Sequence, residues 1–142
     1  MEASGAGLFK EITSSFHVND HSFLIVSGKG NNGGDGIVLA RYLKQAGAKC
    51  RLYFPVGLPT SGPSNSHLRY YETFGYSYET DQPDDAATVI IDALLGAGTK
   101  LPLSPGVKQC TDWINAQKAC RLSIDLPTGA ASDSGHCDES VI

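Results

Sequence analysis

The sequence contains no hydrophobic run close to the ~18–20 apolar residues needed to span a bilayer. Residues 1–5 include an acid and precede no long apolar stretch, so they do not resemble a secretory signal. None of the four cysteines forms a C-x-x-C pair, which argues against a zinc knuckle and, without a secretory signal, against a disulfide framework. The net charge of −4 gives no bulk attraction to nucleic acid or an anionic membrane. We therefore expect reduced thiols, a cytoplasmic location and no nucleic-acid or membrane partner.

The composition is that of one folded domain. The chain has 142 residues, of which 41% are hydrophobic and 18% are charged, so it is not a charged disordered tail. Single domains cluster at ~100–150 residues, and a chain of this size buries roughly two thirds of its unfolded surface. The sequence therefore supports a single domain with its own hydrophobic core.

Apolar residues follow two spacings along the chain. Short apolar runs predict strands at residues 22–28, 49–55, 88–95 and 121–126. Helical spacing predicts an opening helix through Leu8, Phe9, Ile12 and Phe16, then helices at residues 36–46, 65–74 and 105–117. Residues 29–36 are too rich in Gly and Asn to be expected in a regular element. This alternation predicts an α/β fold, a Rossmann-like three-layer αβα sandwich with a mostly parallel sheet.

Three polar segments each follow directly from a predicted strand. They are residues 28–36, 92–102 and 125–129. In a parallel sheet the carboxyl ends of the strands share one edge, and ligands bind there. We therefore expect the three segments to form one polar pocket at that edge.

The first segment, GKGNNGGDG, is a candidate ligand site rather than a plain tight turn. A strand that leads through a glycine-rich turn into a helix suits an anion. It is not a P-loop, because the Lys-Ser/Thr pair is absent and Asp35 would repel a triphosphate. A dinucleotide fingerprint is also disfavoured, because its third glycine, Gly33, is expected in the loop and because no acid closes the second predicted strand. The paired Asn and the Asp favour hydroxyls, amides or a hard cation.

The other two segments add oxygen ligands. Asp92 lies in an apolar strand, where it either accepts loop N–H bonds or contacts a cation or ligand. Lys100 is either a solvated lysine or a group that binds phosphate or moves a proton. Asp125 either caps a turn or serves as an acid or base, or as a partner for sugar hydroxyls. Asn32, Asp92 and Thr128 could converge on one hard cation, since oxygen-only ligands disfavour the softer transition metals.

Taken together, the motifs resemble one family. The strings NNGGDG at residues 31–36, DALLGAG at 92–98 and SIDLPTG at 123–129, with MEASG at 1–5, are similar to the YjeF N-terminal domain, the NAD(P)H-hydrate epimerases. The resemblance covers nearly all of the chain, with three motifs in the family's order and spacing. It implies epimerisation of the R and S forms of hydrated NADH and NADPH, with a fused or separate ADP/ATP-dependent dehydratase and a homodimer among the expected partners.

The resemblance also implies site residues. It assigns potassium to Asn32, Asp92 and Thr128, where Thr128 replaces a common Ser and keeps a hydroxyl. Asp125 is the first candidate for the acid or base and Lys100 the second. The implied substrate-binding residues are Asn31, Asn32, Gly33, Gly34, Asp35, Gly96, Ala97, Gly98, Thr99, Lys100, Leu101, Pro102 and Asp125.

Two further expectations follow from the resemblance. The chain stops soon after its third motif, so residues 1–142 are expected to be one incomplete domain whose sheet is truncated at its C-terminal side. The alternatives are a non-catalytic nucleotide-binding or protein-interaction scaffold of the same fold, and an ordinary dinucleotide-binding oxidoreductase. Some scaffold relatives lose the polar motifs, whereas Asp35, Asp92 and Asp125 are present here, which favours the enzyme.

Overall fold

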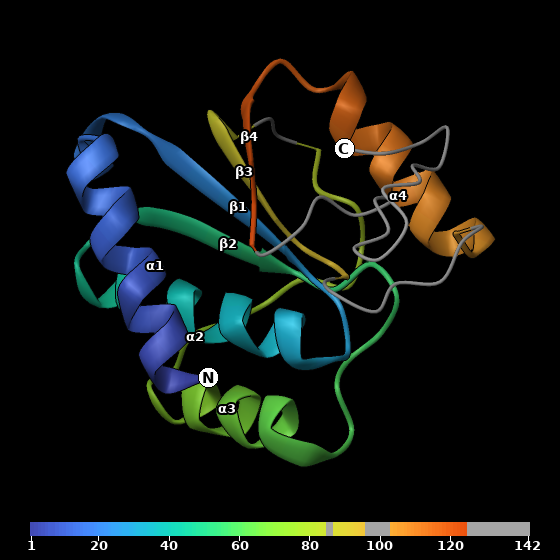
Figure 1. Ribbon diagram of the computed structural model, residues 1–142, viewed down its shortest axis with the longest axis horizontal. Coiled ribbons are helices and arrows are strands. Elements are labelled where there is room, and N and C mark those ends of the chain that lie inside the picture. The colour runs from blue at the N-terminus through green and yellow to red at the C-terminus, as the bar shows by residue number, and fades with distance from the viewer. Residues whose placement is uncertain (85–86, 96–102, 125–142) are drawn as a thin grey trace, which may run out of the picture.

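The computed structural model describes residues 1–84, 87–95 and 103–124, and within them a parallel four-stranded sheet lies between two layers of helices (Figure 1). The strand order is β2-β1-β3-β4, and every neighbouring pair is parallel. The expected α/β architecture is therefore confirmed. The elements, in chain order, are α1 (Glu2–Ser15), a 3-10 helix (Val18–Asp20), β1 (Ser22–Ser27), α2 (Asn31–Gln45), β2 (Lys49–Tyr53), α3 (Gly62–Thr73), β3 (Val89–Ala93), α4 (Pro105–Ala116) and β4 (Cys120–Ser123).

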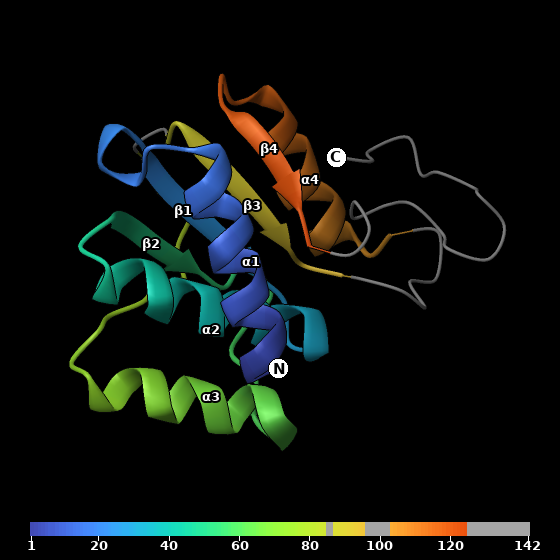
Figure 2. The ribbon, with the colours of Figure 1, turned by 60° about the vertical axis from the view of Figure 1, so that its left-hand side comes forward.

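Alternation along the strands places one apolar cluster on each face of the sheet. Phe23 and Ile25 of β1 pack with α1, α2 and α3, whereas Leu24 and Val26 face the other way and pack with α4. Figure 2 shows α4 alone on its face and α3 beyond α2 on the opposite one. Both faces of β1 and β3 are buried, which explains their near-continuous apolar sequences. In the ranges described, no helix combines the length and apolar character needed to cross a membrane.

A further bridge extends the sheet beyond β2. After α3 the chain returns to the outer side of β2, where the backbone N–H of Phe54 donates to Glu79 O (2.9 Å) and that of Glu79 to Leu52 O (2.8 Å). The chain then passes to the far side of β1, where it forms β3. Consecutive segments therefore lie on opposite sides of β1, and the change of direction falls between β1 and β3. In doubly wound sheets this switch point opens the crevice in which ligands bind.

The start of α2 differs from the sequence prediction. Residues 29–36 were expected to be irregular, but α2 begins at Asn31 and includes the whole NNGGDG string. The local sequence favours a loop because Asn and Gly have low helix propensity. Tertiary packing outweighs that preference: a Cβ at Gly33 would overlap the carbonyl oxygen of Gly28, and one at Gly36 would lie 2.7 Å from Ser27 Oγ. The glycines let the first turns of α2 lie directly against the end of β1.

Candidate functional site

The carboxyl ends of β1, β3 and β4 lie side by side at one edge of the sheet. Ser27 at the end of β1 is paired with Ala93 of β3, and Asp92 of β3 is paired with Ser123 of β4. All three strands are parallel, so the polar segments that follow them start from this same edge. This is the juxtaposition on which the predicted pocket depends, and it is confirmed for the strand ends that the structure describes.

The glycine-rich turn after β1 is packed against β3. The backbone N–H of Gly28 donates to Ala93 O (3.0 Å), and a Cβ at Gly28 would overlap Leu94 O. Gly33 lies in the first turn of α2, so placing it in a loop was wrong, and so was the objection to a dinucleotide fingerprint that rested on that placement. Gly28, Gly30 and Gly33 have the G-x-G-x-x-G spacing, with the third glycine at a close helix–strand contact. The turn therefore brings the backbone of the β1–α2 connection into close contact with β3 and with the first turn of α2.

Asn32 joins this turn to the loop that follows β3. Its side-chain amide nitrogen donates to Leu95 O (2.7 Å), while the neighbouring Asn31 is exposed. The bond holds the first turn of α2 to a segment 63 residues away in sequence. It also uses the nitrogen of the Asn32 amide, so the oxygen is the end of that group left to act as an acceptor. Asp35 lies one turn further along α2 and is half-buried.

Asp92 is a buried carboxylate at the same edge. It is 1% exposed, and it accepts hydrogen bonds from the backbone N–H of Leu94 (3.1 Å) and the hydroxyl of Ser123 (3.3 Å). The loop N–H contact is one of the two roles expected for it. Burial raises the pKa of the Cys110 thiol to about 12, and the negative charge of Asp92 adds to that rise. The polar contacts of Asp92 offset the cost of burying its charge.

Sequence reasoning did not identify Ser64 as part of this site. Ser64 lies in the first turn of α3, is 3% exposed, and donates its hydroxyl hydrogen to Gly30 O (2.7 Å). Gly30 is the residue that caps the N-terminus of α2. The sequence does show Pro63 near the start of α3, which is typical of a helix N-terminus. No local signal indicates that a hydroxyl 34 residues from Gly30 reaches its carbonyl group.

Part of the predicted site lies outside the described residues. For the cation set, the structure describes Asn32 and Asp92 but not Thr128. These two supply amide and carboxylate oxygens, which suit a hard cation. Among residues 1–84, 87–95 and 103–124, no three His, Cys, Asp or Glu side chains gather at one place. The remaining predicted site residues outside the described ranges are Gly96, Ala97, Gly98, Thr99, Lys100, Leu101, Pro102 and Asp125.

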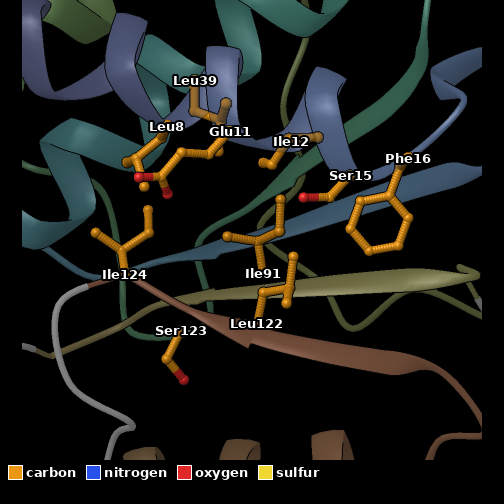
Figure 3. Close-up of a pocket in the computed structure, with 10 residues that line it drawn as sticks. All are labelled: Leu8, Glu11, Ile12, Ser15, Phe16, Leu39, Ile91, Leu122, Ser123 and Ile124. Atoms are coloured by element: carbon orange, nitrogen blue, oxygen red, sulfur yellow. The ribbon is translucent and has the colours of Figure 1, made fainter.

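A separate pocket of about 350 Å³ lies between α1 and the sheet (Figure 3). Leu122 and Ile124 of the β4 segment point toward α1, whereas the side chain of Ser123 points away from them. Ser123 therefore faces the α4 side, where it meets Asp92. Because its lining is mainly apolar and lies on the other face from Asp92, this pocket is not the polar site predicted from the motifs.

The chain is similar to proteins named for the repair of nicotinamide cofactors. It is 32% identical over 139 residues to an NAD(P)H-hydrate epimerase of Oenococcus oeni, a match that covers 96% of this chain and 66% of that protein. It is also 32% identical over 142 residues to a bifunctional NAD(P)H-hydrate repair enzyme of Archaeoglobus fulgidus, with 99% of this chain and 30% of that protein covered. The chain thus spans about a third to two thirds of the length of these relatives.

Comparison of folds and of sequence families agrees with these relatives. A crystal structure of a yeast protein matches with a TM-score of 0.84 at 23% identity, and the match covers 99% of this chain and 65% of the yeast chain. That likeness confirms the fold. The model of the family described as YjeF-related protein N-terminus matches residues 1–142. The chain therefore belongs to the YjeF-related protein N-terminus family.

Proposed function

We propose that this chain carries the activity named for its epimerase relatives, the interconversion of the R and S forms of hydrated NADH and NADPH. The observation that best supports the proposal is the clamp at the switch point. Asn32 donates to Leu95 O, and Gly28 and Gly33 permit close backbone contact, so that the β1–α2 turn and the end of β3 form one polar edge. A strand–helix junction of this kind suits an anionic nucleotide substrate.

The residues of the first turn of α2 and those that follow β3 would have different roles in this reaction. Asn31, Asn32, Gly33, Gly34 and Asp35 would bind the substrate, while residues 96–102 would hold its phosphate region. Epimerisation at the carbon that carries a hydroxyl and the ring nitrogen proceeds by loss of the hydroxyl or by ring opening, and either route needs an acid or base. Asp125 is our first candidate for that group and Lys100 the second.

We further propose that Asn32, Asp92 and Thr128 hold a potassium ion. The support is the chemistry of the two described donors, a buried carboxylate and an amide whose nitrogen is already engaged. The ion would supply a fixed positive charge near the anionic substrate. Replacing potassium chloride by sodium chloride at equal ionic strength should lower the rate, whereas an equal rate in both salts would contradict the proposal.

The activity is tested with purified chain and a mixture of NADPH hydrate enriched in the R form. Chromatographic separation of the two epimers follows the reaction with time. We expect the mixture to approach the epimer equilibrium faster with the chain than in buffer alone. Asp125→Asn should lower the rate by ~10²–10⁴-fold if Asp125 is the acid or base. Asp20→Asn, at an exposed position in the 3-10 helix, is the matched control. No acceleration by the unaltered chain would contradict the proposed function, and full activity of Asp125→Asn would exclude that residue.

The proposed partners follow from the same reaction. A dehydratase that uses ADP or ATP accepts only the S form, so with this chain present, which converts R into S, the whole mixture of R and S forms should be consumed. Sedimentation of the purified chain would test the proposed homodimer, and fractionation of cells would test the proposed cytoplasmic location. A dehydratase reaction that stops in the presence of the chain once the initial S form is used up would contradict the coupling.

A further inference from the structure

We propose that Ser64 is a positioning residue of this site, which acts by fixing the Gly30–Asn31 peptide that begins α2. Its hydroxyl donates to Gly30 O from α3, while the first turn of α2 carries Asn31 and Asn32. The contact of these asparagines with the substrate rests on the proposed function. The role of Ser64 in holding them rests on the geometry of the described residues.

Two donors meet on the carbonyl oxygen of Gly30. The backbone N–H of Gly34 donates to it at 3.1 Å, as the first bond of α2, and the hydroxyl of Ser64 donates at 2.7 Å. In a trans peptide the C=O and the following N–H point in opposite directions. Fixing the Gly30 carbonyl therefore also fixes the N–H of Asn31, to which helix geometry gives no acceptor within α2. That N–H points out of the N-terminal end of the helix.

The same turn is held from its other side by Asn32. Its side chain donates to Leu95 O at the end of β3, whereas Ser64 approaches from α3. Packing leaves little room between these attachments: a Cβ at Gly34 would overlap Met1 Sδ and lie 2.7 Å from Ser64 Oγ. The first turn of α2 is thus clamped between the sheet and α3, and Ser64 supplies the polar contact on the α3 side.

Removal of the Ser64 hydroxyl leaves Gly30 O with the bond from the backbone N–H of Gly34. The Gly30–Asn31 peptide then loses one of its two constraints. A hydrogen bond of this kind contributes ~1 kcal/mol, which corresponds to about a fivefold change in an equilibrium constant. Because Asn31 and Asn32 would bind the substrate rather than react with it, the loss should appear in KM.

The test compares Ser64→Ala with Ser66→Ala. Ser66 lies on the same helix, is exposed, and donates its hydroxyl to Gly62 O within α3, so it controls for loss of a serine from α3. In ¹H–¹⁵N spectra of the ligand-free chain, we expect Ser64→Ala to shift the Asn31 amide resonance and Ser66→Ala to leave it in place. With NADPH hydrate, Ser64→Ala should raise KM about fivefold with kcat changed less than twofold, and Ser64→Cys, a weak donor, should fall between.

The outcomes separate the two proposals. A lower melting temperature of Ser64→Ala with an unmoved Asn31 resonance and an unchanged KM would overturn the positioning role and leave a packing role only. An unaltered chain without epimerase activity would contradict the proposed function. In that case the Asn31 resonance still tests whether Ser64 has the positioning role. Titration with NADPH, as a non-reacting probe, then replaces the measurement of KM. Unequal dissociation constants for Ser64→Ala and Ser66→Ala support the positioning role, and equal ones overturn it.

Discussion

At the scale of single residues, Asn31 and Asn32 are chemically identical neighbours with different surroundings. Asn31 is exposed, whereas Asn32 donates its side-chain N–H to Leu95 O (2.7 Å). An Asp at either position places a negative charge in the first turn of α2, where the helix dipole favours it by ~0.3–1 kcal/mol. Only Asn32→Asp also removes a donor and sets a carboxylate against a carbonyl oxygen. We expect the free energy of unfolding of Asn32→Asp to be about 1–2 kcal/mol lower than that of Asn31→Asp.

Urea unfolding of both variants at neutral pH measures this difference. Asn31→Asp is the control for charge and for helix propensity, and it should be as stable as the unaltered chain or slightly more so. Equal free energies of unfolding for the two variants would mean that the Asn32–Leu95 bond contributes nothing net to stability. In that case the Asn32–Leu95 bond would no longer be evidence for the geometry of the proposed site.

Two features of the site were not predictable from the sequence, because both depend on contacts between distant residues. The NNGGDG string has low helix propensity, yet it forms the start of α2, since only glycine fits where Gly33 meets Gly28 O. Ser64 reaches Gly30 O from another helix. By contrast, the burial of Asp92 and the shared edge of the strand ends could be predicted, because they follow from strand periodicity and parallel topology alone.

At the scale of elements, the docking of α1 on α2 depends on one small residue. A Cβ at Gly5 would overlap the side chain of Val38 on α2, whereas nothing lies within 4 Å of a Cβ at Gly7. The docking is completed by Glu2 of α1, which pairs with Arg41 and accepts a hydrogen bond from the Tyr42 hydroxyl (2.5 Å). Both glycines lie in the interior of α1, so helix propensity treats them alike.

The two alanine variants should therefore change stability in opposite directions. Gly7→Ala should raise the free energy of unfolding by ~0.5–1 kcal/mol, because alanine costs less entropy than glycine in a helix. Gly5→Ala should lower it by ~1–3 kcal/mol through overpacking against α2. Thermal unfolding followed by circular dichroism measures both. If Gly5→Ala is as stable as Gly7→Ala, α1 can shift along α2 without loss of stability. The contact between Gly5 and Val38 would then not restrict the residue at position 5.

At the scale of the whole molecule, the half-buried Cys50 and the buried Cys110 report on opposite faces of the sheet. Cys50 packs with the cluster of α1, α2 and α3, and Cys110 belongs to the cluster under α4. Burial raises the pKa of each thiol to about 12. A raised pKa means that the folded chain keeps a proton that the unfolded chain releases near pH 8.5. The free energy of unfolding should therefore be unaffected by these thiols at neutral pH and should fall as the pH rises from about 8.5 toward 12.

Thiol labelling then shows whether the two faces unfold together. Cys120 is exposed and Cys137 lies outside the described residues, so the variant Cys120→Ser/Cys137→Ser leaves one thiol on each face of the sheet, the half-buried Cys50 and the buried Cys110. Since both helical layers pack on β1, β2 and β3, we expect a single cooperative transition, in which Cys50 and Cys110 react with a thiol reagent at the urea midpoint given by circular dichroism. Reaction of Cys110 at a lower urea concentration than Cys50 would show that α4 detaches while the α1–α2–α3 face stays folded. Single variants at Cys50 and Cys110 assign each phase to its thiol.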